Sequence, residues 1–340
     1  MTVTPDTDDG PPRARRRTRV TSTDVLCVLL VLVMLGQSAV QQVLDVPALR
    51  TAATVFVAIC IQALPFLVLG VLLSGAITAF LPAHVLRRVL PSGENRAVGV
   101  AGLAGVGLPT CECASVPVAR RLIGQGVPAS VALTFMNAAP AVNPVVLVAT
   151  AVAFPGEPGM VLARFLGSLA TAMVLGWLWA RWGKTEWIIE RARRRVAGVQ
   201  PGNRWRTFTE TARGDLVDAG GFLVLGAGVA AAMNVLIPAE WYGTLSEQLL
   251  LAVVVMALLA VVLALCSEAD AFVVASLPGV PLPAKLVFLV VGPVVDAKLI
   301  MLYSGTFGRS FAVRFVPVAF VVAVACGLAA ALLVLGGGGR

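Results

Sequence analysis

Cys111-Glu112-Cys113 is the segment whose residue types and spacing are most suggestive of chemistry. Cysteines separated by one residue do not readily form a relaxed disulfide, but in a turn both sulfur atoms can face one centre and bind a soft, thiophilic atom. Cys266 could supply a third sulfur if distant parts of the chain meet. The alternative is that cysteine is a small apolar packing residue, which we favour for Cys27, Cys60 and Cys326. The pair at 111 and 113 therefore predicts a site for a soft metalloid, and no cofactor is expected.

Ionisable residues inside apolar stretches need an explanation, because a charge at the centre of a bilayer is costly. They are Glu112, Glu268, Asp270, Asp296 and Lys298. Carboxyl groups without enough cationic partners tend to bind protons there, as a proton-coupled carrier requires. Static pairing of Lys298 with Asp296 or Glu112 is a compatible alternative. Arg164 and Lys285 lie near expected span ends, where their side chains can reach water, so we assign them no role.

A second candidate element surrounds Asn143. Pro140 and Pro144 remove amide donors four residues apart, and Asn143 can offer its side-chain amide to freed carbonyls or to a ligand. Pro293 precedes Asp296 in a similar arrangement. Irregular backbone in a bilayer persists only where it faces protein or a water-filled cavity. The expected substrate-binding residues are Cys111, Cys113, Asn143, Cys266, Pro140 and Pro144; the alternative for each proline is a packing kink.

The composition identifies the setting of these residues. In 340 residues, 58% are hydrophobic and 13% charged, and the mean hydropathy is +0.90. Such a chain has room for about 8 to 10 spans of roughly 20 residues, which excludes a large soluble catalytic domain. We expect an all-α integral membrane protein with spans near 24–44, 51–81, 97–121, 127–154, 158–182, 214–238, 248–277, 284–306 and 311–336.

The basic residues indicate topology. They account for the net charge of +8 and cluster in 1–23 and 183–213, which places both segments in the cytoplasm of a protein in the cell membrane. We expect a disordered tail over 1–23, a first transmembrane helix over 24–50, a first repeat over 51–182, a basic linker over 183–213 and a second repeat over 214–336. Nucleic-acid binding is not expected, since no aromatic interleaving accompanies the charge.

The chain repeats itself at nearly constant offsets. Residues 66–70 recur at 222–226, Cys111-Glu112-Cys113 aligns with Cys266-Ser267-Glu268, and 140–144 aligns with 293–297. Duplicated halves are typical of transporters. The 51–81 span ends in a basic loop, whereas 214–238 starts from the basic linker. The positive-inside rule therefore predicts opposite orientations, an inverted repeat with broken or re-entrant helices.

This assignment leaves three apolar segments between two cytoplasmic loops, where an even number of crossings is needed. We expect 97–121 to form a re-entrant hairpin, because it is broken near 105–111 and ends in Arg120-Arg121, which belong with the cytoplasm. The alternative is a break within 127–154, between Pro140 and Pro144.

With these motifs in view, the chain resembles the family of predicted permeases that includes the organoarsenical efflux permease ArsP. The resemblance covers about 50–310 and is carried by the Cys-x-Cys segment followed by Val116-Pro117-Val118, by 124–128 and by 138–144. It implies a transporter whose studied members extrude trivalent arsenicals, with Cys111 and Cys113 matching the cysteine pair as arsenic ligands. Glu112 departs from the small or polar residue expected between them.

These observations favour a secondary carrier, not an enzyme, that moves a small-molecule substrate and is surrounded by membrane lipid. An intramembrane dithiol redox protein and a membrane subunit of a larger complex are the alternatives. ATP-driven transport by this chain alone is excluded, since no GxxxxGK[ST] loop occurs. A homo-oligomer or a small membrane partner stays open.

Overall fold

The computed structural model describes residues 47–80, 91, 93–107, 110–183, 204–236, 248–277 and 279–336. By internal contacts the chain divides into two units, Met1–Arg50 and Thr51–Arg340, and the fold below is that of the second. The expected tail, the first span at 24–44 and most of the basic linker lie outside the described residues. Every regular element in the described ranges is a helix.

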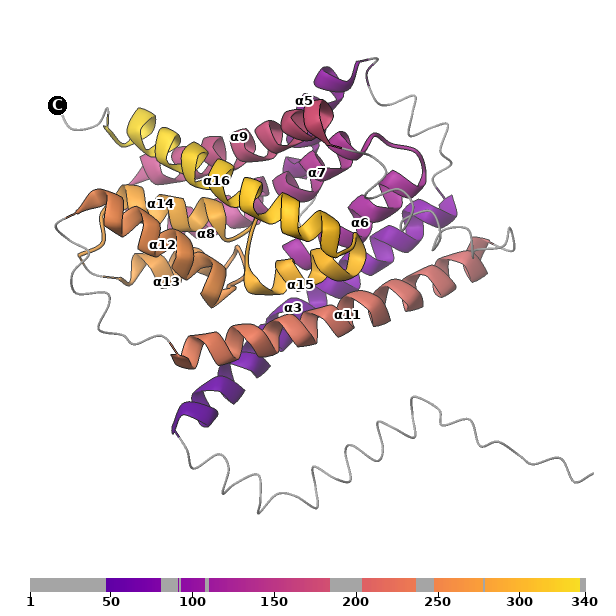
Figure 1. Cartoon of the computed structure of the whole chain (residues 1–340), viewed down its shortest axis with the longest axis horizontal. Coiled ribbons are helices and arrows are strands. Elements are labelled where there is room, and N and C mark those ends of the chain that lie inside the picture. The colour runs from indigo at the N-terminus through magenta and orange to yellow at the C-terminus, as the bar shows by residue number, and fades with distance from the viewer. Residues whose placement is uncertain are drawn as a thin grey trace, which may run out of the picture. The chain divides into compact units, whose positions relative to one another are not determined.

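The helices occur in the same order in each half of the unit (Figure 1). The first half contains α3 (Pro47–Phe80), α5 (Glu94–Ala104), the 3-10 turn η1 (Gly105–Gly107), α6 (Glu112–Gly124), α7 (Ala129–Val142), α8 (Pro144–Ala153) and α9 (Pro158–Trp182). The second half contains α11 (Arg204–Leu236), α12 (Leu249–Leu263), α13 (Asp270–Ala275), α14 (Leu282–Val291), α15 (Ala297–Thr306) and α16 (Arg309–Val334).

Most expected spans are present, and several are interrupted. Helices α3, α9 and α16 are continuous. The 97–121 segment is broken between α5 and α6, as expected, and 127–154 is also interrupted, at Asn143 alone. The segments 248–277 and 284–306 each form two helices. Helix α11 begins at Arg204, inside the expected linker. Its first turns are basic, and they continue the same helix as the apolar residues that follow.

Three stretches in the described part of the chain are long and apolar enough to cross a membrane, and three shorter ones are also apolar. The long ones are Ala129–Ala153, Pro158–Trp182 and Arg309–Val334; the short ones are Leu49–Ile61, Leu249–Leu263 and Leu282–Val291. Apolar helices of this length satisfy their own backbone hydrogen bonds, which makes them suitable for lipid.

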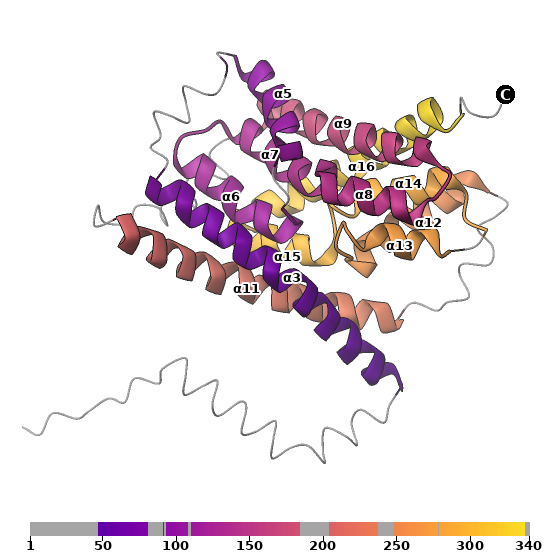
Figure 2. The same cartoon turned by 180° about the vertical axis from the view of Figure 1, so that it is seen from behind.

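Helix packing follows a similar pattern in the two halves (Figure 2). Helix α7 contacts α5, α6 and α9, while α14 contacts α12, α13 and α16. Helices α9 and α16 also pack together and run antiparallel, because Gly159 faces Leu335 at one end and Trp179 contacts Phe311 at the other. The irregular segments between α5 and α6 and between α12 and α13 are thereby held within the helical bundle.

Candidate functional site

The break before α6 positions the Cys-x-Cys segment. Gly105 packs so tightly on α7 that an added Cβ would lie 2.8 Å from the Ala139 nitrogen, so the turn requires a residue without a side chain. Cys111 has extended backbone and precedes Glu112, the first residue of α6. Cys111, Glu112 and Cys113 are all buried. The dithiol expected from the sequence is therefore present and enclosed.

A second break presents Cys266. Helix α12 ends at Leu263, and the next residue, Ala264, has a φ of 48°, in the left-handed region that is rare for residues other than glycine. The chain then turns through 265–269, and the Cys266 carbonyl accepts hydrogen bonds from the amides of Ala269 (2.9 Å) and Asp270 (3.0 Å). Cys266 and Ser267 are buried. A strained terminus thus places a buried thiol at the start of α13.

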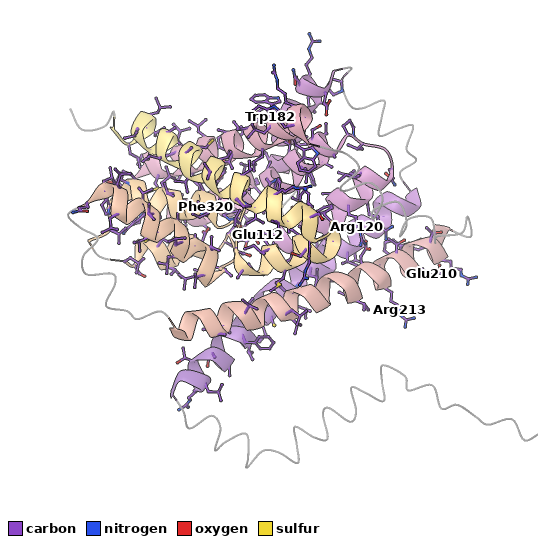
Figure 3. The ribbon with its side chains drawn as sticks, viewed as in Figure 1. Glu112, Arg120, Trp182, Glu210, Arg213 and Phe320 are labelled. Carbon is purple, nitrogen blue, oxygen red and sulfur yellow. The ribbon has the colours of Figure 1, made fainter. Side chains whose placement is uncertain are left out.

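The two breaks meet at Glu112. Its Oε1 accepts a hydrogen bond from the Ser267 amide at 3.2 Å and a close one from the Ser267 hydroxyl. Two segments that align in the sequence repeat therefore lie in direct contact, although 155 positions separate Glu112 from Ser267. Figure 3 shows Glu112 within the bundle.

Lys298 lies on the other side of Cys266. Its Nζ is 3.9 Å from the Cys266 sulfur and 3.3 Å from the Leu265 carbonyl oxygen, and it forms an ion pair with Asp296 at 3.3 Å. The static pairing considered from the sequence is thus confirmed for Asp296. Gly226 of α11 allows this arrangement, since a Cβ there would lie 2.5 Å from the Lys298 Cα.

Asn143 and Asp296 occupy equivalent positions at the interrupted helices. The Asn143 Oδ1 accepts from the Val146 amide at 3.0 Å, and its Nδ2 donates to the Ala139 carbonyl at 3.1 Å. The Asp296 Oδ1 accepts from the Leu299 amide at 2.6 Å. Each residue caps the N-terminus of the helix that follows it. Of the roles expected for Asn143, satisfying freed backbone groups is the one that the structure displays.

Arg164 corrects the sequence analysis, which expected its side chain to reach water. It is fully buried, at 0% exposure. Its guanidinium donates to the Thr150 hydroxyl at 2.8 Å and to the Ser267 carbonyl at 3.0 Å, and it pairs with Asp270 at 2.8 Å. Position near a span end was misleading, because partners more than 100 positions away are invisible in the local sequence.

Arg120 and Arg121, which the sequence predicts to lie on the cytoplasmic side, have buried side chains. Both pair with Asp215 of α11. The Arg121 Nη2 lies 3.0 Å from the Asp215 carboxylate, and the Arg120 contact is closer still. In Figure 3, Arg120 lies on α6 toward α11. Asp215 was not singled out by the sequence, because the first half of α11 also contains Glu210, Asp218 and several arginines.

The remaining candidates are distributed unevenly. Pro140 is buried inside α7, whereas Pro144 is the first residue of α8 and is exposed. Glu268 is half-buried, and Lys285 contacts the Ala275 carbonyl at 3.3 Å. No group of three or more His, Cys, Asp or Glu residues in the described ranges is placed to hold a metal ion. Cys111, Cys113 and Cys266 are therefore not gathered as a three-ligand site in the described part of the chain.

Comparison with known proteins gives the family. A family described as predicted permeases matches residues 48–332. The chain belongs to this family of predicted permeases. A Bacillus subtilis permease relative, UPF0718 protein YcgR, is 32% identical over 287 residues, covering 83% of this chain and 96% of that protein. A Streptococcus mutans protein, named as a two-component membrane permease complex subunit, is 33% identical over 276 residues, covering 79% and 91%. No solved structure matches the permease.

Family membership and the apolar helices together make the chain a multi-pass membrane permease. The family and the Streptococcus mutans relative are named for transport and not for catalysis. The buried thiols, carboxylates and ammonium group are therefore parts of a transport protein.

Proposed function

We propose that this permease is a secondary carrier that exports a small thiophilic solute, such as a trivalent arsenical, in exchange for protons. The contact between Glu112 and Ser267 carries the proposal, because it joins the buried segment that contains Cys111 and Cys113 to the buried segment that contains Cys266. Soft thiolate ligands select soft atoms over hard cations such as Mg²⁺. A bilayer-depth cluster of this kind is suited to binding and releasing such a solute.

The binding step is balanced without a redox partner. Methylarsenite, CH₃As(OH)₂, reacts with two thiols to form two As–S bonds, and the hydroxides leave as two water molecules with the thiol protons. Cys111 and Cys113 are proposed as the two ligands; Cys266 would have to move closer to them to serve as a third, because no three such residues are grouped in the described structure. Asn143 and Pro140 would shape the site without contacting the solute, since both are engaged in helix structure.

Protons are assigned to carboxyl groups without a cationic partner. Asp270 pairs with Arg164 and Asp296 with Lys298. Among the described residues, Glu112 and Glu268 form no such ion pair, and each retains a buried oxygen without a hydrogen bond. An uncompensated carboxyl group in a bilayer tends to bind a proton. Glu112, which touches the other half, is our first choice for the coupling residue.

Alternating access would arise from two inverted repeats, 51–182 and 214–336, with a cytoplasmic N-terminus. The antiparallel α9 and α16 support this arrangement. Helices α3 and α11, which contain the aligned segments 66–70 and 222–226, also cross antiparallel: Gly75 faces Phe208 and Gly220 faces Leu67. Related helices that run in opposite directions are the expected signature of inverted repeats.

A second role, as one subunit of a two-component complex, is favoured by the name of the Streptococcus mutans relative. In that case a separate membrane protein would complete or regulate the carrier. Efflux by the purified chain alone would exclude the need for such a partner.

The proposal is tested by arsenic retention in arsenic-sensitive cells, measured by elemental mass spectrometry after loading with arsenite or methylarsenite. Cells with the wild-type permease are expected to retain several-fold less arsenic than cells with Cys111→Ser/Cys113→Ser. The matched control is Cys326→Ser, a half-buried cysteine on α16, which should behave as wild type. Equal retention in all cells, with the protein present in the membrane, would contradict an arsenical cargo.

A further inference from the structure

Two buried ion-pair bridges join the halves of the permease. In the first, Arg120 and Arg121 of α6 pair with Asp215 of α11; we name it the α6–α11 bridge. In the second, Arg164 of α9 pairs with Asp270 of α13; we name it the α9–α13 bridge. Each bridge takes its cations from the first half and its carboxylate from the second, so each must break if the halves separate there.

The α6–α11 bridge lies near one face of the bundle. The N-termini of α5 and α7 meet through the Ser130 hydroxyl and Glu94 at 2.5 Å, and the Trp177 indole of α9 donates to the Asn95 carbonyl at 3.4 Å. These contacts put the start of α5, the start of α7 and the end of α9 at one level. Helix α6 leads into α7 through residues 125–128. Its C-terminal arginines therefore belong near this level.

The α9–α13 bridge lies deeper, toward the opposite face. Arg164 precedes Trp177 along α9 by about 20 Å at the rise of an α-helix. Glu112 precedes Arg120 along α6 by about 12 Å. Ser267 connects the two regions, because its amide and hydroxyl donate to Glu112 while its carbonyl accepts from Arg164. Along this path the buried thiols of Cys111, Cys113 and Cys266, which we name the thiol cluster, lie between the two bridges.

Both bridges are closed, and the cluster between them is enclosed. Cys111 is 0% exposed and Glu112 is 1% exposed, so a solute would have no path to the thiols from either face. Removing one partner of a buried ion pair is strongly destabilising, because it leaves an uncompensated charge in a low-dielectric interior. A carrier must open one such barrier while the other stays shut.

We propose that these bridges are the two gates of the permease, each controlling access to the thiol cluster from one face of the membrane. The inference rests on the proposed carrier function. The α6–α11 bridge opens the path from the face that carries residues 125–128, and the α9–α13 bridge opens the path from the opposite face. Arg120, Arg121, Asp215, Arg164 and Asp270 act as gating residues without binding the solute.

The test is the sidedness of thiol labelling. The background replaces Cys27, Cys60 and Cys326 with alanine, so that Cys111, Cys113 and Cys266 are the remaining thiols. A membrane-impermeant maleimide is applied to right-side-out and inside-out vesicles. Asp215→Asn is expected to raise labelling about tenfold from the face of 125–128 alone, and Asp270→Asn about tenfold from the opposite face alone. Asp215→Glu and Asp270→Glu, which keep the charge, should label slowly like the background.

Glu210→Gln is the matched control, because it removes an exposed ion pair with Arg206 on the same helix, where the side chains are 78% and 54% exposed. It should leave labelling unchanged. Labelling that rises from the same face in both variants, or in neither, would overturn the gates. If an Asp variant does not accumulate in membranes, the arginine partners are replaced instead, as Arg120→Gln/Arg121→Gln or as Arg164→Gln. Each of these variants should raise labelling from the same face as the Asp variant of its bridge.

Because labelling needs no transported solute, the gates and the arsenical cargo are tested independently. Opposite sidedness without arsenical efflux would retain the gates and reject the cargo. Efflux that is intact while labelling does not change would retain the carrier and reject the gates.

Discussion

At the scale of residues, Asn143 and Asp296 have the same structural role but different charges. Each caps the helix that follows an interruption, but Asn143 is neutral and donates to Ala139, whereas Asp296 is paired with Lys298. Lys298, the ion-pair partner of Asp296, also lies 3.9 Å from the Cys266 sulfur. The first half therefore contributes a structural break, and the second contributes a break that carries an ion pair to the thiols.

Replacing Asn143 tests the cap. Asn143→Ala removes the acceptor for the Val146 amide and the donor to the Ala139 carbonyl in a buried setting. The expected loss of stability is about 1–2 kcal/mol, seen as a lower midpoint of thermal unfolding in detergent. Asn95→Ala, at an exposed position of α5, should change the midpoint little. An unchanged midpoint for Asn143→Ala would mean that the cap is dispensable.

Single residues were predictable where their own chemistry is unusual. The pairing of Lys298 with Asp296 followed from the cost of placing charged groups in lipid, whereas the roles of the Cys-x-Cys pair and of Glu112 stay predictions. Arg164 was not predictable in this way, because its partners Thr150, Ser267 and Asp270 become neighbours through the fold. The contact of Ser267 with Glu112 was not predicted either, because a serine in an apolar stretch carries no charge that needs an explanation.

At the scale of elements, close approach at glycine sets how the helices pack. A Cβ on Gly176 of α9 would collide with the Thr134 hydroxyl of α7 and would lie 3.0 Å from a Val98 methyl group of α5. The α5, α7 and α9 group can therefore pack tightly because this position has no side chain. The arrangement positions α7, against which the Gly105 turn before the Cys-x-Cys segment rests.

Gly176→Val should break this packing. Overpacking a tight helix contact costs about 1–3 kcal/mol, so the thermal midpoint in detergent and the yield of folded protein should both fall. Gly228→Ala on α11 is the comparison, because nothing lies within 4 Å of a Cβ there. Alanine favours a helix over glycine, so that variant should be as stable as wild type or slightly more stable. Equal midpoints for the two variants would contradict the packing account.

The elements were largely predictable because glycine, proline and charge mark their ends. Helix α9 begins at Pro158 and ends at Trp182, as the apolar run predicts. The interruption at Asn143 and the break near 105–111 follow from missing donors and small residues. The start of α11 at Arg204 was not predictable from apolar residues, since basic residues are compatible with helix in water.

At the scale of the whole molecule, the proposed inverted repeat makes a testable prediction about topology. The segments 82–96 and 183–213 are both expected in the cytoplasm, which requires a re-entrant element between them. Single cysteines introduced at Ser92 and at Gly202, in a chain whose native cysteines are replaced, should react with an impermeant maleimide from the same side of the membrane. Reaction from opposite sides would contradict both the inverted topology and the re-entrant hairpin at 97–121.

The central claim is that the buried thiols and Glu112 couple solute efflux to protons, and the most direct test uses the purified permease in proteoliposomes. Methylarsenite release and internal pH are followed together under an imposed pH gradient. We predict release that accelerates with the gradient and is accompanied by proton movement. Cys111→Ser/Cys113→Ser should abolish release, and Glu112→Gln, which can still accept from Ser267, should uncouple it from pH. Release no faster than from protein-free liposomes, at any gradient, would contradict the claim.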